Sequence, residues 1–476
     1  RRCASTSSSS KRSCASAVSR GRALAPRTPP IAPLLLRGGT ILTLDAAASV
    51  HPDTDLLLDA GRIAALGRRL AVPAEARVLD VSGHLILPGL VQGHVHLGQT
   101  LFRGLAEGRA LLPWLRERIW PLEAAHDDET AYASGRTGAA ECLLGGTTAI
   151  QEIGLGPGIA GLLAALAESG LRATAGKCLM DAGEGLPPGL CEPAVASLAH
   201  AVELGERFER AGNGRLRAVL NPRFALSCSD ALWRGVVEVA TERNWPVHTH
   251  ALEQRAEGLA VRREKQGRDE IEYFADLGLL ERDLRIAHGV WLRPRHFRRF
   301  IGRRFAVVHC PGSNLKLGSG IAPIVAIRRA GIPVGIGADG PPCNNRLDGW
   351  AELRLAAQLA SVRSGPGSLS GLEALRLATS EGARVLGLAD EIGSLEVGKR
   401  ADLVVLRTDL PELAVAPAVD PHDRVAFGAS PAAVRHVAVD GELLVEDGRL
   451  TRWDLEEILS AARTATAKLL ARAAIF

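Results

Sequence analysis

Residues 85–104, LILPGLVQGHVHLGQTLFRG, decide the fold. A Val- and Leu-rich run follows a Pro-Gly turn and ends at the triplet His94, Val95 and His96. Side chains alternate along a β-strand, so His94 and His96 are expected on one face and Val95 on the other. Two imidazoles on one face at a strand end supply half of a metal site, although the same triplet also occurs as two unrelated histidines. The rest of the chain has to decide between these two interpretations.

Beyond this stretch, hydrophobic strand candidates alternate with segments of helical spacing such as 127–144 and 230–243. Eight β/α units over roughly 290 residues are typical of a TIM barrel, so the predicted fold class is α/β with a (β/α)8 barrel. The expected strands are residues 89–97, 147–153, 171–180, 216–224, 247–250, 284–290, 305–310 and 334–338.

Short strands and tight turns occupy residues 34–87, and the same texture returns at 393–409 and 434–450. Asp440-Gly441 is a hairpin turn signal in the last of these segments. We therefore expect a small β-sandwich domain assembled from both ends of the chain. The predicted organisation is an extension at 1–33, sandwich parts at 34–88 and 391–450, the barrel at 89–390, and a C-terminal helix at 451–476.

The two ends of the chain differ in character. Residues 1–33 are rich in Ser, Arg and Pro and contain no acidic residue, so we exclude them from the fold as an upstream extension or, alternatively, a transit peptide. Residues 454–474 have the spacing of an amphipathic helix that docks on the protein. Its expected apolar side consists of Leu455, Ile458, Leu459, Ala462, Leu469 and Leu470.

Composition restricts the class of protein. The chain has 476 residues, of which 46% are hydrophobic and 23% charged, and no apolar run approaches the ~20 residues that span a bilayer. The formal charge is only +4, and the one basic run, 293–304, is expected to be a solvated face, so no nucleic-acid or membrane partner is predicted. Eight cysteines without a C-x-x-C pair favour reduced thiols and a cytoplasmic location.

Polar side chains gather where the predicted barrel strands end, which is where TIM barrels carry their active sites. Three histidines and one aspartate suit a divalent zinc-like ion with an open position for water, and a nearby carboxyl group can shuttle protons. Spacing alone leaves either of the two fifth-strand histidines as the ligand, because they share a face. The strand-end residues are His94, His96, His248, His250, Glu253, His288, His309 and Asp339.

A single metal is expected. A two-metal site of this type would need a bridging carboxylated lysine on the fourth strand, but Lys177 falls on the third. We therefore predict one divalent ion, with Zn²⁺ preferred and Fe²⁺ or Mn²⁺ as alternatives.

Five motifs, in the order PGLVQGHVHL, HTHALE, IAHGVWL, VVHCPGSNLKLGSGIAP and GIGADGPPCNN, resemble the amidohydrolase superfamily. Within it they are similar to the aminohydrolase branch of S-adenosylhomocysteine, methylthioadenosine and 5′-deoxyadenosine deaminases, alongside guanine deaminases and triazine hydrolases. The resemblance runs from about residue 34 to 450. It implies a barrel with a split β-sandwich, and a family habit of homo-oligomers.

The resemblance also implies roles for the strand-end residues. Its His-x-x-Glu pattern makes His250 the fifth-strand ligand and Glu253 the acid/base residue, and leaves His248 beside the site. His288 would hydrogen-bond the attacking water or the oxygen of the tetrahedral intermediate, and His309 would be structural or line the pocket. His94, His96 and Asp339 would complete the metal site, with Asp339 also accepting a proton.

Four further residues are expected to bind substrate. LPWLRERIWPLE resembles the adenosine-type enzymes, which implies that Trp114 lines the pocket and Glu123 binds ribose hydroxyls; Asn314 lies in a run close to the same subgroup. Arg223 stands where methylthioadenosine/S-adenosylhomocysteine deaminases carry a histidine that contacts adenine, and a guanidinium can only donate hydrogen bonds.

The predicted function is hydrolytic deamination of a small purine nucleoside such as 5′-deoxyadenosine, methylthioadenosine or S-adenosylhomocysteine, with release of ammonia. The alternatives are a guanine or 8-oxoguanine deaminase and an s-triazine hydrolase, because one hydroxide mechanism serves all of these substrates. A non-catalytic scaffold on the same fold is the alternative of another class.

Overall fold

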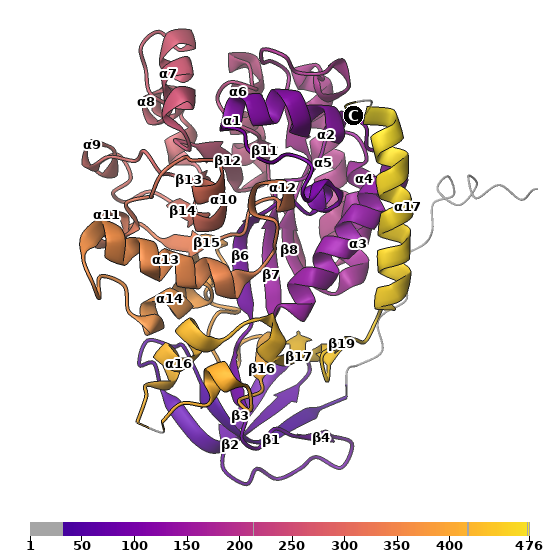
Figure 1. Ribbon diagram of the computed structural model, residues 1–476, viewed down its shortest axis with the longest axis vertical. Helices are drawn as coiled ribbons and strands as arrows, with labels where there is room; N and C mark the ends of the chain where they lie inside the picture. Colours follow the sequence, from indigo (N-terminus) through magenta and orange to yellow (C-terminus); the bar gives the residue numbers. More distant parts are fainter. Residues whose placement is uncertain (1–31, 213, 417, 474, 476) are drawn as a thin grey trace, which may run out of the picture. The chain divides into compact units, whose positions relative to one another are not determined.

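The computed structural model describes residues 32–476 except 213, 417, 474 and 476, so residues 1–31 of the expected extension lie outside the described part. The described chain contains an eight-stranded parallel sheet with the strand order β10-β8-β7-β6-β15-β14-β13-β12 (Figure 1). Its members are β6 (Leu90–Val95), β7 (Thr147–Glu152), β8 (Arg172–Ala175), β10 (Leu216–Ala218), β12 (Val247–Ala251), β13 (Leu284–His288), β14 (Phe305–His309) and β15 (Val334–Ile336).

The parallel sheet closes into a barrel. A parallel bridge between Leu220 and Val247 joins the chain just after β10 to β12, which are the two ends of the strand order. Each strand has a counterpart among the eight expected segments, and the TIM-barrel prediction is confirmed. The strands consist mainly of buried aliphatic residues, as expected where helices cover the outer face of a parallel sheet.

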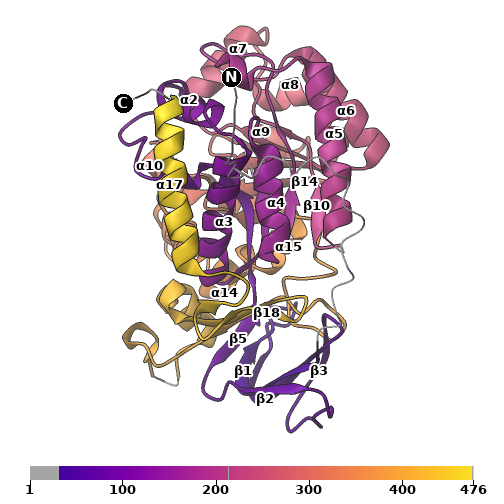
Figure 2. The same cartoon turned by 90° about the vertical axis from the view of Figure 1, so that its right-hand side faces the viewer.

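Helices surround this barrel (Figures 1 and 2). Their starts carry capping signals: Asp127 accepts a hydrogen bond from the Thr130 amide at the start of α3, and Ser229 caps α6 in the same way. The longer helices are α3 (Asp128–Leu144), α4 (Ile159–Ser169), α5 (Ala194–Ala211), α6 (Asp230–Arg243), α7 (Arg255–Glu264) and α13 (Gly349–Ser364). The shorter ones are α8 (Glu270–Asp276), α9 (Pro294–Phe297), α10 (Pro311–Lys316), α11 (Ile324–Arg329), α12 (Pro341–Asn344), α14 (Gly371–Leu377), α15 (Ser380–Val385) and α16 (Pro421–Gly428).

A second, mixed sheet combines the two ends of the described chain, as expected. Strand β16 (Leu403–Leu406) pairs antiparallel with β5 (Leu85–Pro88), which leads directly into β6. Asp440 and Gly441 both have positive φ, 48° and 75°, as a two-residue type I′ hairpin turn requires. The other strands are β1 (Leu34–Leu42), β2 (Val50–Asp59), β3 (Arg62–Gly67), β4 (Arg77–Asp80), β17 (Val434–Val439), β18 (Glu442–Glu446) and β19 (Arg449–Leu450).

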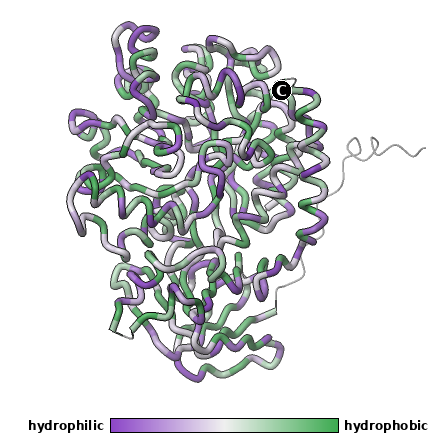
Figure 3. Tube along the Cα trace, in the orientation of Figure 1, coloured by the Kyte–Doolittle hydropathy of each residue, from purple (hydrophilic) through white to green (hydrophobic). Residues whose placement is uncertain are grey.

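Helix α17 (Leu455–Ala473) docks along α3, as Figure 2 shows, and carries both hydrophobic and hydrophilic residues along its length (Figure 3). Its buried residues are Ile458, Ala465 and Leu469. The expectation that Leu455 and Leu459 share this face is wrong, since they are 41% and 42% exposed. At 3.6 residues per turn, Leu459 points about 100° away from Ile458.

Two class predictions can be compared with the structure. In the described part of the chain, no helix combines the length and the apolar character needed to cross a bilayer. The cysteines that the structure describes all carry free thiols: Cys142, Cys178, Cys191, Cys228, Cys310 and Cys343.

Candidate metal centre and active site

Four side chains from three strand ends of the barrel converge on one point. His94 and His96 come from β6 and the residue after it, His250 comes from β12, and Asp339 follows β15. One donor atom from each lies within 4.8 Å of the others. Asp339 Oδ1 is 3.2 Å from Nε2 of both His94 and His96. The four residues expected as ligands therefore form a His/His/His/Asp metal site.

Hydrogen bonds fix the histidine rings so that their Nε2 atoms face the site. Nδ1 of His250 donates to the Arg223 carbonyl at 2.7 Å. Nδ1 of His94 lies 2.7 Å from Nε2 of His248, whose own Nδ1 lies 3.1 Å from the Arg285 carbonyl. We assign Nδ1–H to each ring, since this tautomer satisfies all three contacts and leaves Nε2 with a lone pair for a metal.

The electrostatics suit a cation. Burial lowers the pKa of His94 to about 4 and holds that of His250 well below its ordinary value, so both rings are neutral, as metal binding requires. Burial alone would raise the pKa of Asp339, but the close contacts of Oδ1 with the His94 and His96 rings outweigh burial and hold that pKa well below its ordinary value. His94 Nε2 is buried and has no hydrogen-bond partner among the described residues. Three imidazoles and one carboxylate fit a divalent zinc-like ion.

Backbone strain marks the same strand ends. Asp339 and His288 have φ values of 61° and 72°, in the left-handed region that residues with a side chain rarely occupy. The Asp339 amide donates to the His94 carbonyl at 3.1 Å, which ties the last ligand to the first. Such conformations persist where the surrounding structure enforces them, typically at functional sites.

Glu253 and His288 lie beside the four ligands. Glu253 Oε2 is 3.4 Å from His288 Nε2, which is 3.9 Å from Asp339 Oδ2. Burial, reinforced by the charge of Asp339, raises the pKa of Glu253 to about 8, so this carboxyl group can carry a proton at neutral pH. The buried Asn314 accepts a hydrogen bond from His288 Nδ1 at 3.0 Å and does not line the cavity beside the metal site.

The cavity beside the metal site is small and covered. Its volume is about 20 Å³, which is room for one water molecule. The helical segment 111–124, which we call the cover, closes one side of the cavity through residues such as Trp114. It consists of α1 (Leu111–Trp114), a π-helical turn η3 (Leu115–Ile119) and α2 (Trp120–Ala124). Such turns are frequent at functional sites. The lining residues are His96, Leu111, Trp114, Leu115, Arg223, Phe224, His250, Glu253, Glu257, His288, Leu317 and Asp339.

Arg223 and Glu123, expected to bind substrate separately, bind each other. Arg223 Nη1 donates to both Glu123 oxygens, at 2.9 and 2.7 Å, and both side chains are buried. Gln99 Nε2 donates to Glu123 Oε1 at 2.7 Å. Donors of the protein therefore occupy the Glu123 carboxylate. Of these three residues, only Arg223 lines the cavity.

The sequence did not indicate several residues that contact the metal ligands or the other side chains of the site. Ser313 Oγ donates to Asp339 Oδ2 at 2.6 Å, and Ser319 Oγ donates to Glu253 Oε1 at 3.3 Å. Both serines lie within the motif GSNLKLGS, so that motif was the available signal. Gln99 follows His96 by three residues, and Glu257 follows Glu253 by four, but neither spacing by itself indicates a contact with the site.

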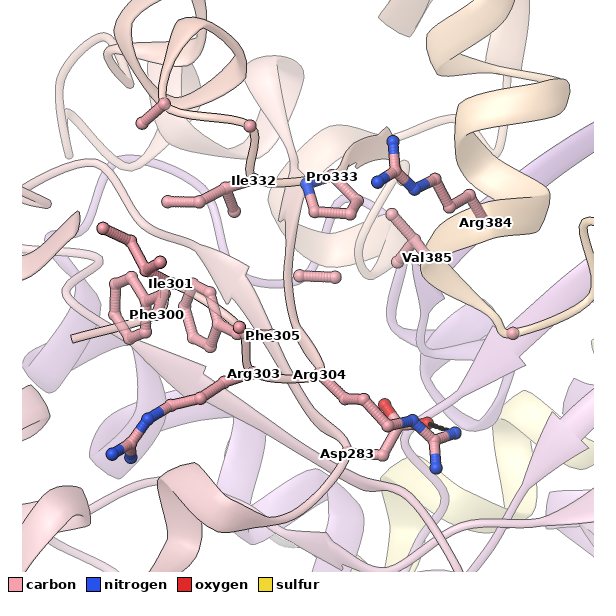
Figure 4. Close-up of a pocket in the computed structure, with 15 residues that line it drawn as sticks. Asp283, Phe300, Ile301, Arg303, Arg304, Phe305, Ile332, Pro333, Arg384 and Val385 are labelled. Atoms are coloured by element: carbon pink, nitrogen blue, oxygen red, sulfur yellow. Dashed lines mark hydrogen bonds and ion pairs between the residues drawn. The ribbon is translucent and has the colours of Figure 1, made fainter. Parts of the chain in front are cut away.

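A larger cavity of about 400 Å³ lies at the opposite ends of the strands, where β13, β14 and β15 begin (Figure 4). It contains none of the metal-site residues. Arg303 and Arg304, from the basic run, line it, and each forms an ion pair at 2.7 Å, with Glu281 and Asp283 respectively. His309, at the end of β14, is buried and lines neither cavity.

Comparisons with known proteins agree with this geometry. Residues 85–444 match the model of the Amidohydrolase family. The 5-methylthioadenosine/S-adenosylhomocysteine deaminase of Halobacterium salinarum is 36% identical over 92% of this chain and 99% of its own. The 5′-deoxyadenosine deaminase of Methanosarcina acetivorans is 32% identical, covering 93% and 100%. The crystal structure of an adenosine deaminase from Xanthomonas campestris with bound Zn superposes with a TM-score of 0.84 at 30% identity, covering 92% and 98%.

Proposed function

Because the chain belongs to the Amidohydrolase family and is a metal-dependent aminohydrolase, we propose that it deaminates a 5′-modified adenosine. The candidates are 5′-deoxyadenosine, methylthioadenosine and S-adenosylhomocysteine. The observation that carries the proposal is the placement of Glu253 and His288 beside the four ligand side chains, in a chain that is similar over most of its length to deaminases of these nucleosides.

When bound by His94, His96, His250 and Asp339, a divalent ion supplies a hydroxide nucleophile at neutral pH. Glu253, with its raised pKa, takes up a proton and delivers it to the ring nitrogen next to the amine-bearing carbon. His288, whose Nδ1 donates to Asn314, would stabilise the oxygen that develops negative charge through an Nε2 hydrogen in the doubly protonated form of its ring. Asp339 accepts the proton of the newly added hydroxyl group and passes it to the amino group, which leaves as ammonia while the C=O bond forms.

Substrate entry requires movement of the cover. A cavity of about 20 Å³ cannot hold a purine, so the side chains that close it have to shift when substrate binds. We propose that Trp114 then packs against the base or the 5′ substituent. The π-helical turn that follows Trp114 is the point in this segment where the backbone is already irregular.

The ion pair between Arg223 and Glu123 favours a second candidate function. In a nucleoside deaminase Glu123 would have to release Arg223 before it could bind ribose hydroxyls. If the pair stays intact, Arg223 presents donors to the cavity, which suits a base with an acceptor oxygen such as guanine or 8-oxoguanine. A triazine could use the same site, whereas a scaffold would have no use for Glu253 and His288.

Ammonia release by purified, metal-analysed protein tests these proposals. The panel is 5′-deoxyadenosine, methylthioadenosine, S-adenosylhomocysteine, adenosine, guanine, 8-oxoguanine and a chloro-triazine. Turnover confined to the 5′-modified adenosines is expected. Turnover of guanines alone would replace the first candidate by the second, and the metal analysis distinguishes zinc from iron and manganese.

The matched variant is Glu253→Gln, which keeps the shape of the side chain and removes its acid. We expect it to lose several orders of magnitude in kcat while metal content stays unchanged, because Glu253 is not among the four ligands. Full activity in this variant would contradict the assignment.

A further inference from the structure

The turn that carries Glu253 is held by two carboxyl groups from neighbouring helices. Residues 252–254 link β12 to α7, and Leu252 has a φ of 55°. The Leu252 amide donates to Glu270 Oε1 at 3.1 Å, and the Glu253 and Gln254 amides donate to Glu257 Oε2 at 2.9 and 3.2 Å. Three successive amides of the turn are thus bound by Glu257 on α7 and Glu270 on α8, two helices that lie side by side (Figure 1).

The second oxygen of each carboxyl group takes no part in binding the turn. Glu257 and Glu270 are both fully buried, and they bind the adjacent amides of Glu253 and Leu252. Glu257 Oε1 and Glu270 Oε2 nevertheless have no donor among the described residues. Unpartnered oxygens on two neighbouring buried carboxyl groups are satisfied if one of them carries a hydrogen that bonds to the other.

Burial favours the same protonation. It raises the pKa of Glu257 to about 7, with the charge of Glu253 adding to the effect, and it raises the pKa of Glu270 well above its ordinary value, with the charge of Glu257 adding. The other ionisable groups that act on the pair are His288 and Asp269. Two buried carboxylates in contact cannot both ionise without a counter-charge.

We propose that Glu257 and Glu270 share one proton and, as a hydrogen-bonded acid pair, hold the turn 252–254 in the conformation that aims Glu253 at the reacting atoms. Both are positioning residues, since they act through the backbone of Glu253. Their effect is on the catalytic step rather than on metal binding, because within the described part of the chain neither forms a hydrogen bond or ion pair with one of the four metal ligands. The inference rests on the proposed role of Glu253 in deamination.

Single and double glutamine variants test the shared hydrogen. In Glu257→Gln or Glu270→Gln, the amide oxygen keeps the contact with the turn and the NH2 group donates to the remaining carboxylate. Each single variant should therefore keep kcat within about threefold of wild type. In the double variant two NH2 groups face each other without an acceptor, and kcat should fall at least tenfold with KM and metal content little changed.

The control is Glu264→Gln, at the exposed end of α7, which should behave as wild type. Circular dichroism checks that the double variant folds, and Glu270→Met supplies a second disruption that lacks both acceptor and donor and should also lower kcat. A double variant as active as the single ones would overturn the proposal, as would full activity of Glu270→Met.

Infrared spectroscopy of the metal-loaded protein tests the proton without any substrate. The difference spectrum of wild type minus Glu257→Gln at neutral pH should contain a protonated carboxyl C=O band that shifts in D2O. Absence of this band would overturn the shared proton. Because the band needs no turnover, a failure of the deaminase proposal on the substrate panel is distinguishable from a failure of this one.

Discussion

At the scale of single residues, the metal site depends on His248, which is not one of the four ligands. His248 shares a strand face with His250, yet it contacts the ring of His94 and the Arg285 carbonyl instead. Its place in the chain of Nδ1–H donors fixes which nitrogen of His94 faces the site. The ambiguity between His248 and His250 is therefore resolved by the direction of hydrogen bonds, which the spacing of the motif could not show.

Replacing His248 by phenylalanine should weaken metal binding about 10- to 100-fold, because His94 Nδ1 loses the acceptor that orients the ring. His248→Gln should recover most of the affinity, since its side-chain oxygen can accept the same hydrogen bond. Competition with a chromophoric chelator measures both dissociation constants. Equal affinity in the phenylalanine variant and wild type would contradict the role of His248.

Glu123→Gln should lower the free energy of unfolding by about 3–5 kcal/mol, since it leaves the Arg223 guanidinium buried without its counter-charge. Glu117→Gln is the matched control, because Glu117 is 57% exposed and pairs with Arg109 at the surface. Its loss should cost less than about 1 kcal/mol. Urea unfolding of wild type and the two variants measures these free energies. An equal loss of unfolding free energy in both variants would show that the buried pair stabilises the protein no more than the surface pair does.

At the scale of elements, the apolar runs predicted every barrel strand, but two of the runs, 171–180 and 216–224, each form two short strands. The run at 171–180 forms β8 and a separate short strand, β9 (Cys178–Leu179). Between them Gly176 packs so closely against the segment that follows β10 that a Cβ there would stand 2.0 Å from the Val219 carbonyl oxygen. A hydrophobic pattern does not reveal close backbone approach of this kind.

The strand-end ligands were predictable because barrel geometry brings strand ends together, whereas the positions of Gln99, Glu257 and Glu270 depend on the paths of loops.

Helix α17 supports the cover of the site. Leu469 and Ala465 belong to the same buried cluster as Leu115 and Trp114. Leu469→Ala should destabilise the protein by about 2–4 kcal/mol through the cavity it leaves. Leu459→Ala, on the exposed side of the same helix, should cost under about 0.5 kcal/mol. Thermal unfolding of the two variants measures the difference, and equal midpoints would contradict the docking face described above.

At the scale of the whole molecule, one side of the mixed sheet shares a hydrophobic core with the barrel. A single cluster of buried side chains includes Leu87 of β5 and Val404 of β16 together with Leu90 of β6 and Ile150 of β7. Arg172 of β8 adds a buried ion pair with Asp402, next to β16, at 2.8 Å. The two sheets should therefore unfold together.

Removing the metal should lower the stability of this whole unit. A ligand present at 1,000 times its dissociation constant stabilises the folded state by about 4 kcal/mol, so a chelator should reduce the free energy of unfolding by that order and leave one cooperative transition. In His94→Ala, which lacks a ligand, the chelator should have little effect. Urea unfolding followed by circular dichroism and tryptophan fluorescence measures both; two separate transitions would contradict the shared core.

The pairing of β5 with β16 also has a consequence for synthesis on the ribosome. Pro88 leaves the ribosome about 300 residues before its partner Leu403, which at about 5–20 residues per second corresponds to roughly 15–60 seconds. During that time β5 presents an unpaired apolar edge to the surrounding solution. The nascent chain should therefore be a client of chaperones that shield exposed strands until the last quarter of the protein has been made.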